Sequence, residues 1–391
     1  MYTQTATRSA ALAPAQPDQT DPHDSPHQQD QQDKQNQAPQ ARRASGASAP
    51  RIVAQRRLAA DASDAEEGKA SEARSPGANV NNDADNAGFL AGLLAEQAHS
   101  DPKFFYDAQG CALFDAICQL AEYYPTRTEA AIFAEHRADI VRHLPRAAQW
   151  LDLGAGDGAK AQDWLPAVHA YRYIGIDIAA DWLRPAVARI AQAHPCIEAI
   201  GVIADLTQPL ALHGLLAETP EQPAVFFYPG SSIGNFAPPR ALELLQAIRG
   251  HCDARGRLLI GVDLVKDRAT LEAAYDDSLG VTAAFNLNLL RVANQRLGAD
   301  FDLRGFEHVA RFAADQGRIE MHLRARHDQR VNFQFPHAAQ RDYLAGETIF
   351  TECSYKYRPE QFAALLGDAG FGQQQFWTDP AAGFGVFLAA P

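Results

Sequence analysis

The sequence predicts a doubly wound α/β domain that carries an inserted segment of different architecture. Over residues 148–264, short apolar runs alternate with amphipathic segments. Strands separated by helices require right-handed parallel crossovers, which build a Rossmann-like sheet. The alternation stops after residue 267 and returns near residue 359, where a helix and two short strands close the chain. The block between these points therefore indicates an α+β insertion.

The expected elements of the α/β part follow one another in a regular order. Helices are predicted at 159–169, 182–193 and 239–252, and strands at 149–153, 171–176, 197–204, 224–228 and 258–264. A helix at 359–369 and strands at 374–377 and 384–388 would complete the sheet. The strands are short apolar runs, whereas the helices carry apolar residues three or four positions apart.

The inserted block has a different order of expected helices and strands from the α/β part. A helical stretch at 268–297 precedes expected antiparallel strands at 307–312, 318–325 and 329–335. A second helical region begins near residue 86 and is broken before Pro125. We therefore expect two domains, one made of residues 86–127 and 267–356, and one that holds the parallel sheet and is made of residues 128–266 and 357–391.

The first 85 residues have the composition of a disordered tail. They are rich in Gln, Asp, Ala, Ser and Pro and include the low-complexity run HQQDQQD at 27–33. Such a segment buries too little apolar surface to offset its loss of conformational entropy. A basic stretch at 42–57 could contact nucleic acid or a membrane, but an ordinary solvated tail is the favoured interpretation.

Charge and cysteine usage limit the class of protein. The formal net charge of −13 over 391 residues argues against a nucleic-acid partner. Five scattered cysteines without a C-x-x-C pair indicate neither a disulfide framework nor a zinc site. No apolar run approaches the roughly 20 residues needed to span a bilayer. We expect a cytoplasmic monomer that acts on small molecules, without a metal or membrane partner.

A glycine-rich turn after the first expected strand is the candidate cofactor site. The sequence GAGDG at 154–158 follows the strand directly, and parallel sheets bind ligands at the carboxyl ends of their strands. Glycines there allow a tight turn and a close approach of the backbone to the ligand. Taken alone, the motif is compatible with NAD, another nucleotide or a structural turn.

Acidic residues at the ends of the next two strands favour S-adenosylmethionine as the ligand. Asp177 is placed to accept both ribose hydroxyls, and Asp205 to accept the adenine amino group while Leu206 packs on the ring. Helix caps are the alternative role for both aspartates. An ordinary NAD site would show G-x-G-x-x-G instead. Lys160 either reaches the carboxylate of the cofactor or is a solvated residue of the first helical turn.

Several segments outside the turn resemble, in order, the L-histidine Nα-methyltransferases, which form hercynine in the ergothioneine pathway. The resemblance covers residues 104–388 and leaves the N-terminal tail outside. Its carriers are FYDA at 105–108, LF at 113–114, EYYPTRTE at 122–129, GSSIGNF at 230–236, GVDLVKD at 261–267, YDDSLGVTAAFNLN at 275–288, RIEM at 318–321, GET at 346–348 and TE at 351–352.

The resemblance implies a fold, a reaction and a set of contacts. It implies a class I S-adenosylmethionine-dependent methyltransferase that trimethylates the α-amine of histidine. Residues 86–127 and 267–356 would be its substrate-binding domain, and residues 128–266 and 357–391 its methyltransferase domain. The implied cofactor contacts are Gly154, Lys160, Asp177, Asp205 and Leu206. The implied substrate contacts are Tyr123, Asn235, Tyr275, Met321, Glu352 and Ser354, with Tyr106 beside the amine.

These residue types suit the groups of a histidine zwitterion. Asn235 and the Tyr275 hydroxyl can donate to the carboxylate. Glu352 and Ser354 can bond the two imidazole nitrogens, and such a site rejects analogues that lack those groups. The ring of Tyr106 can hold a methylammonium group by cation–π attraction.

The expected chemistry is an attack by the neutral α-amine on the sulfonium methyl, which depends on proximity and orientation. Tyr106 or a bound water is the candidate proton acceptor, and Met321 would form an adaptable apolar wall. Two other interpretations stay open. The acceptor could be another small amino acid or amine, or the chain could be a cofactor-binding regulatory protein without turnover.

Overall fold

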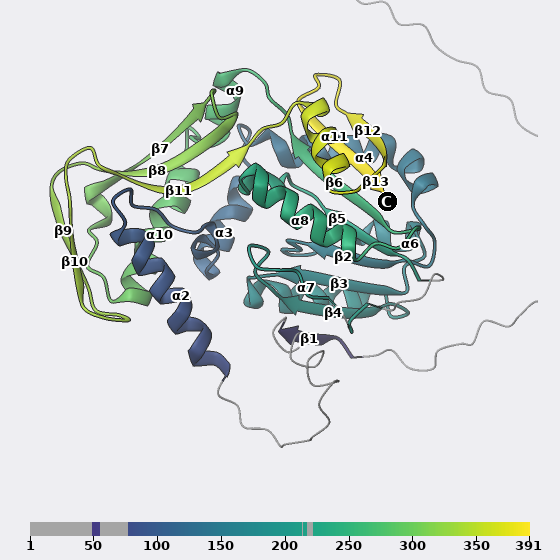
Figure 1. The fold of residues 1–391 in the computed structure, drawn as a ribbon, viewed down its shortest axis with the longest axis horizontal. Coiled ribbons are helices and arrows are strands. Elements are labelled where there is room, and N and C mark those ends of the chain that lie inside the picture. The colour runs from purple at the N-terminus through teal and green to yellow at the C-terminus, as the bar shows by residue number, and fades with distance from the viewer. Residues whose placement is uncertain (1–48, 55–76, 213, 217–221) are drawn as a thin grey trace, which may run out of the picture. The chain divides into compact units, whose positions relative to one another are not determined.

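One mixed sheet of eight strands organises the part of the chain that this computed structural model describes, residues 49–54, 77–212, 214–216 and 222–391 (Figure 1). The strand order is β1-β4-β3-β2-β5-β6-β13-β12. The strands are β1 (Arg51–Ala54), β2 (Gln149–Leu153), β3 (Arg172–Asp177), β4 (Glu198–Ile203), β5 (Ala224–Tyr228), β6 (Arg257–Asp263), β12 (Gln373–Thr378) and β13 (Phe384–Ala390). β1 to β6 pair in parallel, and β13 is antiparallel to both of its neighbours.

The direction of strand addition reverses beside β2. From β2 the chain adds β3 and β4 on one side, and then β5 and β6 on the other. The crevice between the carboxyl ends of β2 and β5 is therefore the topological switch point, where open α/β sheets bind ligands. The doubly wound α/β fold expected from the sequence is confirmed.

Helices cover both faces of this sheet. They are α4 (Tyr124–His143), α5 (Ala159–Gln162), α6 (Trp164–Ala167), α7 (Ala180–Ala193), α8 (Pro238–Gly250) and α11 (Pro359–Asp368). Alternate strand residues face opposite layers: Leu151 packs in the cluster that contains α8 and α11, and Trp150 packs in the cluster that contains α4 and α7. The single helix expected at 159–169 is instead α5 and α6, because Pro166 supplies no amide donor to a continuous helix.

The inserted block and the N-terminal helices share a separate hydrophobic cluster. Their helices are α2 (Gly77–Leu94), η1 (Pro102–Phe105), α3 (Ala108–Ile117), α9 (Arg268–Ala273), α10 (Val281–Leu297) and η3 (Leu303–Gly305). Their strands are β7 (Phe306–Ala313), β8 (Arg318–Ala325), β9 (Gln329–Phe333), β10 (Ala339–Tyr343) and β11 (Thr348–Tyr355). Phe89, Phe105, Leu289 and Leu323 are buried together in this cluster. The shared cluster favours the predicted grouping of the two segments, whose boundaries stay a prediction.

Two antiparallel sheets lie in the inserted block. β11, β8 and β7 form one in that order, and β9 and β10 form a hairpin. The strands expected at 307–312, 318–325 and 329–335 correspond to β7, β8 and β9. The sequence did not predict β10, in which charged and polar residues predominate. No helix within the described ranges is long and apolar enough to cross a membrane.

Two ordered segments correct the expectation of disorder over residues 1–85. β1 pairs with β4, where Arg51 donates to Glu198 at 2.7 Å and Ile52 packs on the core of the sheet. α2 begins at Gly77, well before residue 86. The compositional argument is wrong for β1 because a four-residue strand obtains its hydrogen bonds from an existing sheet edge. The run at 27–33 and most of the basic stretch at 42–57 lie outside the described residues.

Candidate active site

The glycine-rich turn follows β2 and leaves open space beside its backbone. Gly154, Gly156 and Gly158 have φ values of 65°, 54° and 71°, in the left-handed region that favours glycine. A Cβ placed on Gly154 would meet no atom within 4 Å. The Asp177 carboxylate accepts hydrogen bonds from the amides of Gly156 at 2.9 Å and Ala179 at 2.8 Å. Each oxygen keeps acceptor capacity for the hydroxyls of a ligand, so the turn is a preformed cradle.

Asp205 lies after β4 at the same edge and forms an ion pair with Lys103 of the N-terminal helices. Its Oδ1 accepts from the amide and hydroxyl of Thr207 at 2.8 and 2.5 Å, and its Oδ2 lies 3.2 Å from Nζ of Lys103. Lys103 is in η1 and also pairs with Asp85 of α2 at 2.9 Å. Leu206 is half-buried against the core of the sheet. The position predicted to bind adenine is thus linked to the N-terminal helices by an ion pair.

Lys160 pairs with a buried carboxylate that the sequence analysis did not single out. Its Nζ lies 2.6 Å from Oε2 of Glu129, and the Gly230 amide donates to the other oxygen of Glu129 at 2.7 Å. Burial opposes the charge on Lys160, but Glu129 outweighs it and raises the pKa of the lysine. The side chain of Lys160 is 40% exposed and remains open to a ligand. Glu129 therefore joins α4, α5 and the loop after β5.

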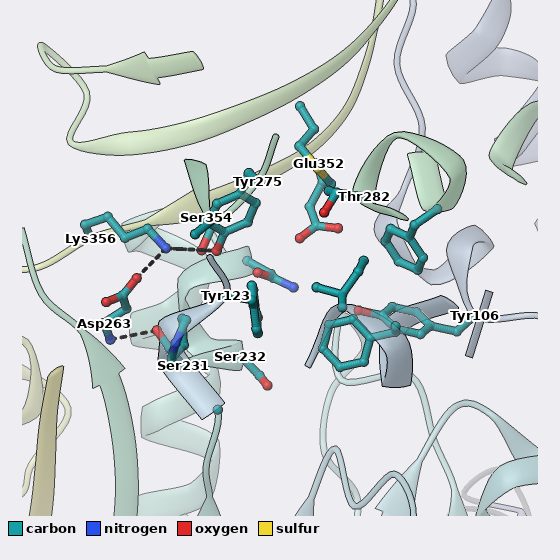
Figure 2. Close-up of a pocket in the computed structure, with 18 residues that line it drawn as sticks. Tyr106, Tyr123, Ser231, Ser232, Asp263, Tyr275, Thr282, Glu352, Ser354 and Lys356 are labelled. Atoms are coloured by element: carbon teal, nitrogen blue, oxygen red, sulfur yellow. Dashed lines mark hydrogen bonds and ion pairs between the residues drawn. The ribbon is translucent and has the colours of Figure 1, made fainter. Parts of the chain in front are cut away.

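A cavity of about 600 Å³, counted out to its open mouth, gathers the predicted substrate residues (Figure 2). All seven line it: Tyr106, Tyr123, Asn235, Tyr275, Met321, Glu352 and Ser354. They come from segments far apart in the chain, including the loop after η1, β8 and β11. The five predicted cofactor residues do not line this cavity. The structure thus brings one predicted set together, and the role of each residue stays a prediction.

The register between β8 and β11 positions the side chains of one cavity wall. Met321 of β8 and Glu352 of β11 are direct cross-strand partners. The register shifts between Phe350 and Glu352, and such a bulge redirects the side chains that follow it. Figure 2 shows the Glu352 carboxylate pointing into the cavity.

Aromatic rings form a second wall. Tyr106 meets Phe114 and Phe285 edge to face at centroid distances of 5.9 and 6.0 Å, and Tyr123 meets Tyr275 in the same way at 6.2 Å. Burial raises the pKa of Tyr106 and of Tyr123 well above the usual value. Both phenols therefore stay protonated at neutral pH, and their rings offer π faces and hydroxyl groups to a ligand.

Glu352 and Thr282 present unpaired polar atoms to the cavity. Oε2 of Glu352 and Oγ1 of Thr282 are buried without a hydrogen-bond partner. Burial raises the pKa of Glu352 to about 7, although Lys356 opposes the shift. A buried polar atom without a partner costs about 1–3 kcal/mol. A ligand that donates to these atoms would recover that free energy.

Comparison with known proteins identifies the family. Residues 85–391 match the family described as histidine-specific, S-adenosylmethionine-dependent methyltransferase. The chain belongs to this family. The resemblance predicted from the sequence is thereby confirmed, and with it the class I methyltransferase fold that the strand order displays.

Individual relatives cover most of this methyltransferase. A histidine N-alpha-methyltransferase of Mycolicibacterium smegmatis is 44% identical over 303 residues, which is 76% of this chain and 92% of the relative. One of Mycobacterium tuberculosis is 39% identical over 318 residues, 78% of this chain and 97% of the relative. Ergothioneine biosynthesis protein 1 of Neurospora crassa is 28% identical and spans 70% of this chain but 31% of that protein.

Sequence reasoning missed a set of polar residues around the site. Lys356, Asp263 and Thr282 line the cavity, and Lys103 and Glu129 hold predicted cofactor residues. Thr282 near the start of α10 has the pattern of an ordinary helix-initiating residue, and the ion pairs join positions that no local pattern connects. Among the described residues, no cluster of three or more His, Cys, Asp or Glu side chains could hold a metal ion.

Asp152 of β2 is a buried residue two positions before the glycine-rich turn. Its protonation predicts how the stability of the protein depends on pH. Asp152 accepts from the Tyr173 hydroxyl at 3.0 Å, and burial raises its pKa to about 8. Between its ordinary pKa and pH 8, the folded protein holds a proton that the unfolded chain has released, so the free energy of unfolding falls as pH rises. Asp152→Asn should flatten this fall in urea unfolding measured from pH 5 to 9. An unchanged slope would contradict a neutral Asp152.

Proposed function

We propose that this methyltransferase adds three methyl groups to the α-amine of L-histidine, forming hercynine as the first step of ergothioneine biosynthesis. The observation that carries the proposal is the cavity, in which Glu352 and Thr282 offer unpaired polar atoms opposite hydroxyl and ammonium groups. These features complement the imidazole and the carboxylate of one small amino acid. The names of the two mycobacterial relatives and of the fungal relative support the same substrate and pathway.

The imidazole is assigned to the wall that Glu352 and Thr282 form. An ionised Glu352 accepts a ring N–H, and the Thr282 hydroxyl can serve either ring nitrogen because it donates and accepts. Each contact satisfies an atom that has no partner in the described structure. Side chains of similar size without ring N–H groups would leave the carboxyl unpaired, which is the physical basis of strong discrimination.

The cofactor is assigned to the turn after β2. The cradle at Gly154 has room for a ligand, and Asp177, Asp205, Leu206 and Lys160 surround the same edge of the sheet. When bound there, S-adenosylmethionine supplies an electrophilic methyl group. The chain must then hold the acceptor amine, keep it unprotonated and exclude competing nucleophiles.

The aromatic wall is assigned to the amine. Tyr106 and Tyr123 present their rings to the cavity, and such faces attract methylated ammonium groups. The raised pKa of Tyr106 keeps its hydroxyl protonated, so this phenol is a poor base. We therefore favour water as the proton acceptor and give Tyr106 an orienting role, which suits a reaction controlled by proximity.

Product analysis tests the proposed function directly. The full-length protein, incubated with L-histidine and methyl-labelled S-adenosylmethionine, should yield histidine carrying three labelled methyl groups on the α-nitrogen, read by mass spectrometry. The same assay with each other amino acid in turn should give little product. If histidine is not methylated although calorimetry shows cofactor binding, the proposal fails. Efficient methylation of a different amino acid would transfer the assignment to that substrate.

A further inference from the structure

Glu129 of α4 is a buried carboxylate whose surroundings are shaped to receive it. Its side chain is 1% exposed, and the Gly230 amide donates to its Oε1 at 2.7 Å. A Cβ on Gly261 of β6 would lie 2.0 Å from the same oxygen. Only glycine therefore leaves room for this carboxylate at that position of the strand. The missing side chain of Gly261 and the amide of Gly230 together hold the carboxylate in one orientation.

Lys160 of α5 is the cation that this carboxylate faces. Its Nζ lies 2.6 Å from Oε2 of Glu129, and in the described part of the chain no other carboxylate lies within 4 Å of it. An ammonium group has three N–H bonds. The contact with Glu129 uses one of them and directs the other two away from Glu129. The side chain of Lys160 is 40% exposed, so these two N–H groups are open to a ligand.

Glu129 also supports the positive charge of this lysine. Burial opposes the charge on Lys160, but the contact with Glu129 outweighs burial and raises the pKa of the lysine. Asp152 and Cys118 are the other acidic groups that face Lys160. Burial raises the pKa of Cys118, and it raises the pKa of Asp152 to about 8, so neither group carries much charge at pH 7. The Glu129 carboxylate is therefore the charge that offsets the burial of Lys160.

Lys160 lies where the glycine-rich turn meets the substrate cavity. It follows Gly158 of the turn by two residues, and its Nζ would lie 3.2 Å from a Cβ on Gly230, which lines the cavity. Asp177 and Asp205 follow β3 and β4, on the opposite side of β2 from β5. In S-adenosylmethionine the sulfonium joins the nucleoside to the amino-acid end. A methyl group near the cavity therefore places the amino-acid end, with its carboxylate, on the side of Lys160.

We propose that Glu129 is the positioning residue for the cofactor carboxylate. It holds Lys160 beside the loop after β5, with two N–H groups free to bind that carboxylate. A lysine side chain loses rotamer freedom when it binds a ligand. Because Glu129 imposes this loss when the protein folds, the cofactor binds to a lysine that is already ordered. The inference rests on the cofactor site of the proposed function.

Two cofactor analogues test the role of Glu129. S-Adenosylhomocysteine carries the carboxylate, whereas its decarboxylated analogue keeps the adenosine and the amine but lacks the carboxylate. Kd values for both are measured by calorimetry at pH 7.5 without histidine. The wild-type protein should bind S-adenosylhomocysteine about 30-fold more tightly than the analogue, or better. In Glu129→Gln, which keeps an acceptor for the Gly230 amide, affinity for S-adenosylhomocysteine should fall about 10- to 30-fold, and affinity for the analogue should change less than about 3-fold.

A double variant shows whether Glu129 acts through Lys160. Lys160→Met should remove the preference for S-adenosylhomocysteine over the analogue. In that background Glu129→Gln should no longer lower the affinity for S-adenosylhomocysteine, because the lysine that it positions is absent. Glu135→Gln, at a position of α4 that is 65% exposed, is the matched control and should change neither Kd. If Glu129→Gln weakens both ligands equally, or weakens S-adenosylhomocysteine without Lys160, the proposal is overturned.

The pH dependence of the preference gives a second readout. Protonated Lys160 binds the carboxylate, so the preference is lost as pH rises through the pKa of the lysine. Burial without the opposing charge of Glu129 places this pKa lower in Glu129→Gln than in the wild type. Over about pH 7 to 10, the preference should therefore decline at a lower pH in the variant. Asp152 titrates in this range in both proteins. Superimposable profiles would contradict the proposed role of Glu129.

Gly261→Ala keeps the test decisive if Glu129→Gln does not fold. Its Cβ would displace the Glu129 carboxylate without removing it, and it should cause the same selective loss of affinity for S-adenosylhomocysteine. Trimethylation of histidine by the wild-type protein, without a selective loss in either variant, rejects this inference alone. Failure of the wild-type protein to bind S-adenosylhomocysteine or to methylate histidine rejects the proposed function instead.

Discussion

Glu352→Gln is expected to lower kcat/KM for histidine by at least about 100-fold and to stabilise the ligand-free protein at pH 8. The activity falls because an amide cannot replace the charged acceptor that faces the imidazole N–H in our assignment. The stability rises because Glu352 is buried, which raises its pKa from 4.5 to about 7. The buried Glu352 carboxylate thus lowers the stability of the ligand-free protein but provides a hydrogen-bond acceptor for the bound substrate.

The sign of the pH effect follows from the direction of the shift. Between pH 4.5 and 7, the folded protein retains a proton on Glu352 that the unfolded chain has released, so the free energy of unfolding falls as pH rises. The loss from this one group amounts to about 3 kcal/mol above pH 7. Glu352→Gln removes this loss, whereas wild-type protein and variant should be similar near pH 4.

Urea unfolding of the two proteins at several pH values measures this difference. Glu360→Gln, at an exposed position in the first turn of α11, is the matched control and should follow the wild type in both stability and activity. Parallel pH profiles for wild type and Glu352→Gln would show that Glu352 is ionised in the empty cavity. Unchanged histidine turnover in the variant would contradict the assignment of Glu352 to the substrate site.

The positions of the predicted cofactor residues at one edge of the sheet could be predicted from the sequence alone. Gly154, Asp177 and Asp205 were placed together because each follows an expected parallel strand, and the carboxyl ends of such strands meet at one edge. That argument needs only local periodicity and the handedness of crossovers. The structure places all three at that edge of the sheet.

The residues that line the substrate cavity could not be predicted from local sequence patterns. Tyr123, Met321 and Glu352 were named through resemblance to a family, since nothing in their spacing joins them. Lys356 and Tyr275 are 81 positions apart, and their contact depends on how β11 packs against the loop after α9. A lysine directly after a strand, such as Lys356 after β11, has the pattern of a solvated residue until its buried partners are known.

Gly110→Ala is expected to destabilise the protein by about 3 kcal/mol or more and to reduce activity about 100-fold. A Cβ on Gly110 would lie 1.6 Å from the carbonyl oxygen of Phe105, a backbone atom that no rotamer change can move. Phe105 is fully buried and stacks on Phe285 at 4.6 Å, and overpacking at such positions is costly. The strain would displace Tyr106, the next residue, from the cavity wall.

The neighbouring contacts leave the backbone little room to adapt. Asp107 caps α3 by accepting from the Gly110 amide at 2.8 Å, and it also accepts from Asn288 at 2.8 Å. Gly88→Ala is the control: this exposed glycine in α2 has no atom within 4 Å of a Cβ, and alanine there should stabilise the helix by about 0.5–1 kcal/mol. Urea unfolding and histidine methylation compare the two variants. Wild-type stability in Gly110→Ala would mean that η1 and α3 can separate, and the packing that holds Tyr106 in place would then be much looser than these contacts require.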